Sequence, residues 1–528
     1  MATLVLPARR VQDRAAVYQA RYVIAFAVTL ASVLELVDTS IVNVAIPHMM
    51  GNLGATLDEI AWVSTGYIVA NVIVLPVTSW FADRFGRRNY YTGSIILFTT
   101  ASFFCGHATT LYGLVGWRVI QGLGGGALIS TAQAILFDVF PIEERGQAMA
   151  IFGMGVMVGP TLGPTLGGWL TDNFSWPWIF YINIPLGAMA AFMTWRNVPE
   201  PAHQVERGDA VDWPGLALLI LGIGALQILL ERGESKDWFQ SREILLETIA
   251  AATGLILFVW HELTTPHPVV DLRILKDRQL AASVIFGMVL GFALYSSVFA
   301  LPVFLQSLLG FGAWDTGKVI LPGAIASAIT MAIVGRLGNR VDARAMITFG
   351  VGLFAWSMWL HAHLTTDSGA GDLLFPMILR GTGLGFIFVP LTGVAVANLA
   401  PGTIPQGTGL YNLSRQLGGS FGIAITATLI TRFRENAREA LRPHLEPGAP
   451  AMQPLLEALT RRFQALGGDL AYAQARAMAV LDLRLERQAS MIAFEKVFLT
   501  MGATFILALP LLLLFKTGRA RVGGGPAH

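Results

Sequence analysis

Two carboxylic acids, Glu35 and Asp38, lie three residues apart within a long apolar run of the sequence. In a helix, a spacing of three residues corresponds to about 300° of rotation, so both side chains share one face. Two carboxylates that close in an apolar environment cannot both stay ionised cheaply, and we predict that at least one of them binds and releases a proton. The alternatives are that Asp38 braces a helix contact and that Glu35 faces polar groups near the lipid headgroups.

Other polar side chains also interrupt apolar runs. A buried charge in a membrane persists only when it faces protein or water, although an arginine can also extend towards the headgroups or form a structural ion pair. Amides in such runs either line a polar cavity or join helices. We predict that a substrate cavity is lined by Gln121, Asn183, Gln227, Gln306, Arg380, Asn412 and Arg415. Arg118 is a further intramembrane arginine.

Between residues 147 and 169, glycine recurs at every fourth position. Such a stripe has almost no side chains, so another helix can pack closely against it. Prolines in the same segment remove backbone donors and should bend the helix. The pattern comprises Gly155, Gly159, Pro160, Gly163, Pro164 and Gly167. From the residues alone, a tight helix contact is a sufficient explanation.

The elements that must position these residues are membrane-spanning helices. The chain has 528 residues, of which 54% are hydrophobic and only 13% charged, too apolar a composition for one water-soluble core. Its apolar runs are each long enough to cross about 30 Å of hydrocarbon. We count fourteen of them, which predicts an all-α polytopic membrane protein.

Short segments rich in Lys and Arg favour the cytoplasmic side of a membrane. They precede the first span, follow the second and tenth spans, and follow the last, which places both termini in the cytoplasm. The segment after the seventh span, with Arg232, Lys236 and Arg242, breaks this pattern. We expect cytoplasmic tails at 1–21 and 517–528.

A weak internal repeat divides the chain. Arg84 and Arg88 have counterparts 256 residues later, and the Arg-Gly pattern that begins at Arg118 has one 262 residues later, at Arg380. Parallel six-helix halves of this kind imply a cavity between them near the membrane midplane. The predicted units are a first half at 22–200, an inserted helix pair at 201–262, and a second half at 263–516 that contains an external hairpin at 431–490.

Five ordered stretches resemble signatures of the major facilitator superfamily, specifically its fourteen-span drug:proton antiporter branch with EmrB-type members. They are LELVDTSIVNVAIP at 34–47, ADRFGRR at 82–88, RVIQGLGGG at 118–126, GVMVGPTLGPTLGGWL at 155–170 and WPWIFYINIPLG at 176–187. The stretches 226–239 and 301–322 resemble the EmrB-type members in particular.

The resemblance implies roles for several residues. Asp38 and Arg118 match positions linked to proton coupling, whereas the proton role of Glu35 is our own inference. Asp83, Arg84 and Arg88 match a loop whose charge contacts steady the outward-open state, although Ser79 stands where the family usually has Gly. The glycine-proline segment is associated with exporters and would seal one side of the cavity.

The predicted function is proton-driven export of hydrophobic small molecules across a bacterial inner membrane by alternating access. No phosphate-binding loop is present, so an ion gradient must supply the energy, with protons as the coupling ion and no cofactor. A single cysteine, scattered histidines and a net charge of +2 argue against a metal cage and against nucleic-acid binding. An uptake symporter of the same fold is an alternative, and a membrane-embedded enzyme is less favoured.

Apolar residues recur at helical spacing in the hairpin 431–490, which indicates amphipathic helices. The EmrB-type resemblance implies that this hairpin docks a periplasmic membrane-fusion adaptor, which continues to an outer-membrane channel. An apolar stripe for the adaptor would comprise Leu455, Leu456, Leu459 and Phe463. The alternative is a solvated hairpin that lies on the protein itself.

Overall fold

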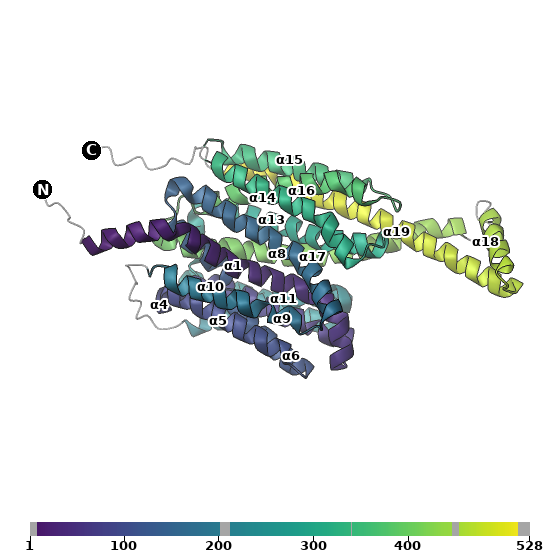
Figure 1. Ribbon diagram of the computed structural model, residues 1–528, viewed down its shortest axis with the longest axis horizontal. Coiled ribbons are helices and arrows are strands. Elements are labelled where there is room, and N and C mark those ends of the chain that lie inside the picture. The colour runs from purple at the N-terminus through teal and green to yellow at the C-terminus, as the bar shows by residue number, and fades with distance from the viewer. Residues whose placement is uncertain (1–7, 201–211, 339, 446–452, 516–528) are drawn as a thin grey trace.

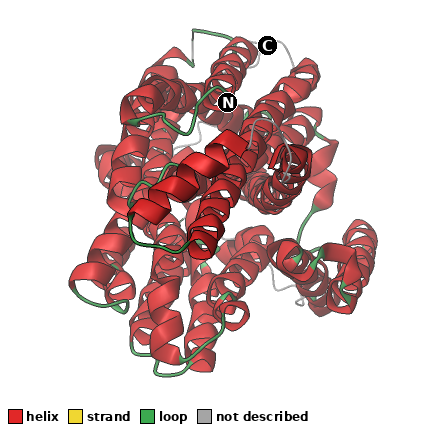
Figure 2. Ribbon diagram, turned by 90° about the vertical axis from the view of Figure 1, so that its right-hand side faces the viewer, coloured by secondary structure: helices red, strands yellow, loops and turns green. Residues whose placement is uncertain are grey.

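The computed structural model describes residues 8–200, 212–338, 340–445 and 453–515. All regular secondary structure in these ranges is helical (Figure 2). This agrees with the predicted fold class, because a helix satisfies its backbone hydrogen bonds internally where no water is available. Residues 1–7, 201–211 and 516–528, which include the first third of the predicted N-terminal tail and the whole predicted C-terminal tail, lie outside the described ranges.

The first half contains the helices up to residue 197. They are α1 (Ala8–Leu53), α2 (Leu57–Ile60), α3 (Trp62–Val74), α4 (Thr78–Phe85), α5 (Arg87–Gly106), α6 (Leu111–Gly125), α7 (Leu128–Val139), α8 (Arg145–Asn173), α9 (Trp178–Tyr181) and α10 (Asn183–Asn197). The inserted pair comprises α11 (Trp213–Arg232) and α12 (Arg242–Thr264). A 3-10 turn, Leu75–Val77, joins α3 to α4.

The second half repeats this plan and adds a hairpin. Its helices are α13 (Arg278–Val303), α14 (Ala313–Leu337), α15 (Ala343–Ala362), α16 (Ala370–Val396), α17 (Ile404–Leu441), α18 (Gln453–Ala465) and α19 (Leu470–Ala508). A π-helical turn, Phe304–Leu308, follows α13, and a 3-10 turn, Leu509–Leu514, follows α19.

Each of the fourteen predicted spans falls on one of these helices or on two or three that follow one another in the chain. Among the described residues, eleven helices are long and apolar enough to cross a membrane, and twelve if the bent α8 counts as one. The two remaining segments are α5 and α17, which contain more polar residues. They lie within the bundle, with α5 packed on α6 and α17 packed on α13.

Close helix contacts recur at matching places in the two halves. In the first half, a side chain at Gly122 would meet the backbone oxygen of Tyr67 on α3, and one at Gly124 would meet the backbone of α5. In the second half, Gly381 meets the backbone of α14 and Gly383 that of α15 in the same way. The paired glycines are 259 residues apart, between the two offsets that the sequence repeat predicts.

The halves meet mainly along α8 and α14. Gly146 of α8 lies against the backbone of Gly335 at one end, and Gly317 of α14 lies against Thr165 at the other. The inserted helix α11 packs against α3 of the first half and α17 of the second. The contacts at both ends of α8 leave no wide passage between these two helices.

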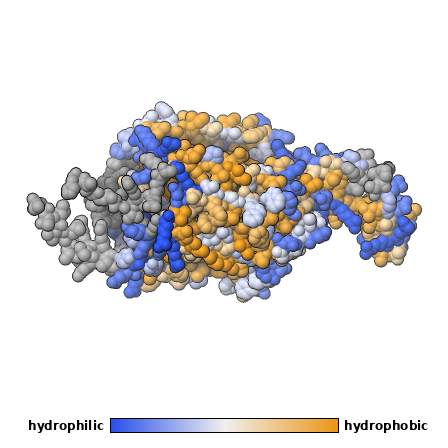
Figure 3. Space-filling model, turned by 90° about the horizontal axis from the view of Figure 1, so that it is seen from above, coloured by the Kyte–Doolittle hydropathy of each residue, from blue (hydrophilic) through white to orange (hydrophobic). Residues whose placement is uncertain are grey.

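The bundle has two different ends. The start of α1 and the end of α19 lie at the left of Figure 1, whereas α18 projects from the right. Figure 3 shows an apolar belt between two more polar rims, with the projecting hairpin beyond one rim. An apolar belt of this kind is the surface that lipid covers.

The hairpin differs from the sequence prediction in one respect. In the described part of 431–490 only α18 is a separate helix, because α17 continues without a break to Leu441 and α19 runs from Leu470 into the last span. Buried alanines and leucines recur every fourth residue along α19, at Ala473, Ala477, Leu481, Leu485 and Ala489. This stripe packs α19 against α18 and α17, so the hairpin is a rigid extension of two spans.

Candidate functional site

Asp38 is fully buried at the centre of the first half, and three side chains donate to its carboxylate. Arg118 Nη1 donates to Oδ2 at 2.5 Å, whereas Gln121 Nε2 and Asn183 Nδ2 each donate to Oδ1 at 2.8 Å. The donors come from α6 and α10, and the acceptor comes from α1. The hydrogen bond from Arg118 is charge-assisted, and the two amides occupy the other carboxylate oxygen.

Arg118 is as deeply buried as its partner. Its Nε donates to the backbone oxygen of Val63 at 3.0 Å, Nη1 also donates to Gln121 Oε1 at 2.9 Å, and the guanidinium stacks 4.1 Å from the ring centroid of Tyr67. Breaking a buried pair by removing one partner costs about 3–5 kcal/mol, because the other charge stays buried.

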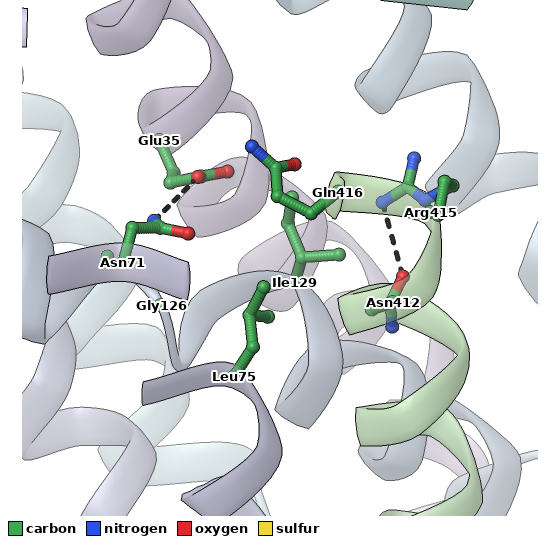
Figure 4. Close-up of a pocket in the computed structure, with 9 residues that line it drawn as sticks. Glu35, Asn71, Leu75, Gly126, Ile129, Asn412, Arg415 and Gln416 are labelled. Atoms are coloured by element: carbon green, nitrogen blue, oxygen red, sulfur yellow. Dashed lines mark hydrogen bonds between the residues drawn. The ribbon is translucent and has the colours of Figure 1, made fainter. Parts of the chain in front are cut away.

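Glu35 belongs to a different environment, although it is only three residues from Asp38. Its Oε1 accepts from Asn71 Nδ2 at 2.9 Å. Its Oε2 has no hydrogen-bond partner among the described residues. Glu35 lines a small cavity, shown in Figure 4, whose volume of about 10 Å³ is room for one water molecule.

Both halves line this cavity. The first half contributes Glu35, Asn71, Leu75, Gly125, Gly126 and Ile129, and α17 contributes Asn412, Arg415 and Gln416. Arg415 Nη2 donates to Asn412 Oδ1 at 3.2 Å, and Asn412 Nδ2 donates across the interface to Gln133 Oε1 at 2.6 Å. Thus Asn412 and Arg415 lie in a cavity between the two halves, and their predicted contact with substrate stays a prediction.

The other predicted cavity residues lie elsewhere. Gln121 and Asn183 belong to the Asp38 network, and Arg380 is buried within the second half, where its Nη1 donates to Ser297 Oγ at 3.0 Å. Gln227 bonds along its own helix to Glu231, and Gln306 is exposed in the turn after α13. Sequence periodicity does not reveal such differences, because every one of these residues lies on an apolar helix.

The charged turn between α4 and α5 is tied to neighbouring helices. Arg87 is ion-paired with Asp138 of α7, and Arg88 Nε lies 3.5 Å from Glu200 Oε2. Arg84 is exposed over the ring of Trp80, and Asp83 lies half-buried beside this group. The turn therefore links α4 and α5 to the end of α7 and to the segment after α10.

The predicted glycine stripe packs against α1, the helix that carries Glu35 and Asp38. A side chain at Gly159 would lie 2.7 Å from Leu36 Cβ, one at Gly163 would overlap Ser40, and one at Gly167 would lie 2.8 Å from Ile41. The helix bends by 41° between Arg145–Pro160 and Leu162–Asn173. The bend occurs where the two prolines remove backbone donors.

Several residues of the site were not identified from the sequence. Asn71 donates a hydrogen bond to Glu35, and the ring of Tyr67 stacks on the Arg118 guanidinium. Ser297 accepts a hydrogen bond from Arg380, and Gln416 lines the cavity. Asn71 lies in an apolar run, as do the amide residues that we predicted to line the cavity. The same criterion would therefore have identified Asn71. Tyr67 and Ser297 have no comparable signal, because such residues are common in membrane helices.

Comparison with known proteins decides the family. A sequence profile of the Major Facilitator Superfamily matches residues 28–423. The chain belongs to this superfamily. It is therefore a multi-pass membrane transport protein, as the ordered motifs predicted.

Its similarity to curated proteins extends over nearly the whole chain. It is 33% identical over 497 residues to the fatty acid resistance protein FarB of Neisseria gonorrhoeae, with 94% of this chain and 96% of that protein covered. It is also 33% identical over 509 residues to the multidrug export protein EmrB of Escherichia coli K12, with 96% and 98% covered. These relatives support the prediction of an EmrB-type member.

Solved structures agree on the fold. The human organic anion transporter MFSD10 superposes with a TM-score of 0.59 at 15% identity, covering 93% of this chain and 99% of that one. The proton:xylose symporter XylE superposes with a TM-score of 0.58 at 12% identity, covering 94% and 96%. At these identities the likeness concerns the fold alone.

Proposed function

We propose that this protein is a proton-driven antiporter that exports hydrophobic and amphipathic compounds across a bacterial inner membrane. The observation that carries the proposal is the buried Asp38–Arg118 pair, held by Gln121 and Asn183 across α1, α6 and α10. A proton on Asp38 would leave Arg118 without its counter-charge, so these helices must rearrange. The pair can thereby link proton binding to the opening of the nearby cavity.

Two further observations support this function. The relatives that cover almost the whole chain are named for multidrug export and fatty acid resistance. The glycine stripe of α8 fixes the proline-bent helix directly against the proton-binding helix α1, so a movement of α1 is transmitted to the interface with α14.

The energy of such an exchange is sufficient. One proton that crosses a potential of 100 mV releases about 2.3 kcal/mol, which corresponds to roughly fifty-fold accumulation of a neutral substrate. We place the end of the bundle that carries Arg87, Arg88 and Arg336 in the cytoplasm, together with both termini, because short basic segments favour that side. The hairpin α17–α19 then projects into the periplasm.

Substrate-dependent proton release from inverted vesicles tests the proposal. The wild-type protein should exchange internal protons for added compound, whereas Asp38→Asn, which preserves shape but removes the charge, should lose at least 90% of the exchange. Asp172→Asn, a matched change at an exposed end of α8, should retain it. Wild-type exchange in the Asp38→Asn protein contradicts the proton role, and proton movement in the same direction as the compound identifies a symporter.

We also propose that the hairpin docks a periplasmic adaptor that leads to an outer-membrane channel. Of the four residues predicted to form an apolar stripe, Leu456, Leu459 and Phe463 are half-buried and only Leu455 is classed as exposed. The exposed apolar side chains of the hairpin are Leu455, Leu466, Leu470, Tyr472, Met478 and Leu483. The docking surface is therefore centred on the tip and on the outer face of α19.

Charge substitutions on that face test the docking surface. Leu466→Glu combined with Leu483→Glu should abolish drug resistance in whole cells and leave transport in vesicles unchanged. The matched control, Gln464→Glu, adds a charge at an exposed position that is already polar. Equal loss in cells and in vesicles would mean that the hairpin is needed for the transporter itself.

A further inference from the structure

We propose that the cavity between Glu35 and Arg415 selects amphoteric substrates, in which an ammonium and a carboxylate are carried on one apolar scaffold. This inference rests on the proposed export function and names its preferred substrate class. Glu35 would receive the ammonium and Arg415 the carboxylate.

The anionic side of the cavity is Glu35, on α1 of the first half. The residue is only 5% exposed, and one of its two carboxylate oxygens is bonded to Asn71. The second oxygen, Oε2, is buried without a hydrogen-bond partner in the described part of the chain. A buried carboxylate oxygen without a donor is costly, so this atom is available to a cationic ligand.

The cationic side is Arg415, on α17 of the second half. It is 2% exposed, and only Nη2 has a hydrogen bond, to Asn412. Nε and Nη1 have no partner within the described ranges, and the ring centroid of Phe388 lies 5.6 Å from the guanidinium carbon. Each of these two guanidinium nitrogens has an N–H group that can donate a charge-assisted hydrogen bond to a carboxylate.

Glu35 and Arg415 together determine which charges a ligand in this cavity should carry. Glu35 and Arg415 line the same cavity without a hydrogen bond between them, and Figure 4 shows them on opposite sides with Gln416 in view between them. A purely cationic ligand would leave Arg415 unpaired, and a purely anionic ligand would leave Glu35 unpaired. A ligand with both charges neutralises both, while Leu75 and Ile129 provide apolar contact for its scaffold.

The same arrangement makes binding compatible with proton exchange. A proton on Glu35 removes the charge that holds the ammonium, so proton and substrate compete for one group. Arg415 keeps its charge throughout, because a guanidinium is not deprotonated in proteins. Since the cavity has room for only about one water molecule, α17 must move away from α1 and α3 to admit a substrate.

Four matched probes test the inference: an amphoteric fluoroquinolone, its methyl ester, its N-acetyl derivative, and the N-acetyl methyl ester. They carry both charges, the cation only, the anion only, and neither. We expect the wild-type protein to export the amphoteric probe with a kcat/KM at least tenfold above the other three. Glu35→Gln should lose at least tenfold on the amphoteric and cationic probes, and Arg415→Gln should lose as much on the amphoteric and anionic probes.

Two controls separate charge from folding. Arg415→Lys keeps the charge and should recover part of the anionic export. Arg380→Gln removes another buried arginine of the same half outside the cavity, and should lower export of all four probes equally. Size-exclusion profiles of the solubilised variants check that each is folded.

The outcomes are distinct. Equal export of all four probes by the wild-type protein, driven by protons, overturns the substrate class and leaves the proposed function intact. An equal loss of all probes in both Glu35→Gln and Arg415→Gln also overturns it, because the pair would then be structural. No proton-driven export of any probe, or of a standard panel of hydrophobic dyes, contradicts the proposed function itself.

Discussion

The polar centres of the two halves occupy matching positions but differ in charge. An offset of 259 residues relates Asp38 to Ser297 and Gln121 to Arg380. In the first half Gln121 donates to Asp38 at 2.8 Å, and in the second Arg380 donates to Ser297 at 3.0 Å. The contact of α1 with α6 in the first half therefore corresponds to the contact of α13 with α16 in the second half. The residues that make the contact differ in charge.

The difference separates two tasks. In the first half a carboxylate neutralises Arg118, so that centre has a group that can take up a proton. In the second half Arg380 contacts a hydroxyl, and its Nε has no partner among the described residues. A guanidinium cannot release its proton, so this centre holds a fixed positive charge. The proton exchange that we propose therefore involves the first half, whereas the polar centre of the second half carries a positive charge without a carboxylate beside it.

The largest effect is expected when Asp38 is replaced by serine, the residue at the matching position of the second half. Asp38→Ser leaves Arg118 buried without its carboxylate, which should lower the free energy of unfolding by about 3–5 kcal/mol. Substrate-dependent proton release should fall at least a hundredfold. Thermal unfolding of the solubilised protein measures the first effect, and proton flux in vesicles measures the second. Wild-type proton release in the Asp38→Ser protein would show that the carboxylate of the first half has no special role in proton exchange.

A smaller effect is expected from filling the glycine contact beside the first centre. Gly159→Leu places a side chain where Leu36 Cβ is only 2.7 Å from the added carbon, and such overpacking costs about 1–3 kcal/mol. The fraction of monodisperse protein should fall, together with transport. Gly393→Leu, in α16, meets no atom within 4 Å of the added Cβ and is the matched control. Equal tolerance of both changes would argue against close packing of α8 on α1.

The reverse exchange, a carboxylate placed beside Arg380, is expected to stabilise the protein. Ser297→Asp gives Arg380 a carboxylate, and a hydrogen bond between charged groups contributes about 1.5 kcal/mol. The variant should unfold at a higher temperature than the wild-type protein, whereas Ser297→Ala should unfold at a lower one. The new carboxylate should not restore proton release to Asp38→Asn, because the Arg118 network lies in the other half.

The smallest effect is expected outside the bundle. Arg438 of α17 lies 3.2 Å from Asp482 and 3.5 Å from Glu486 of α19, but its side chain is 52% exposed. Exposed pairs contribute about 0–1 kcal/mol and weaken with salt. Arg438→Gln should therefore change the unfolding temperature by less than Ser297→Asp does. A loss as large as that of Asp38→Ser would show that the hairpin is held by charge rather than by its alanine stripe.

Sequence reasoning identified Asp38 and Arg118 separately but did not pair them. They are 80 residues apart in the chain, and a helical period relates only neighbours on one helix. It placed Glu35 and Asp38 on one face of one helix, yet their environments differ because α3 supplies Asn71 to one, whereas α6 and α10 supply three donors to the other. Gln306 was chosen by residue type, and its exposure depends on where α13 ends.

The membrane class, the order of the helices, the glycine stripe and the family can all be predicted from the amino-acid sequence, because they follow from apolar length, local spacing and short ordered motifs. Only the tertiary structure decided which buried charges are neutralised. In the folded protein Asp38 pairs with Arg118, and Arg380 donates to the hydroxyl of Ser297. Glu35 and Arg415 line one cavity, and each has side-chain atoms without a hydrogen-bond partner among the described residues. The physical reason is that the cost of a buried charge depends on donors from other helices, whose approach is fixed by packing rather than by the chain next to it.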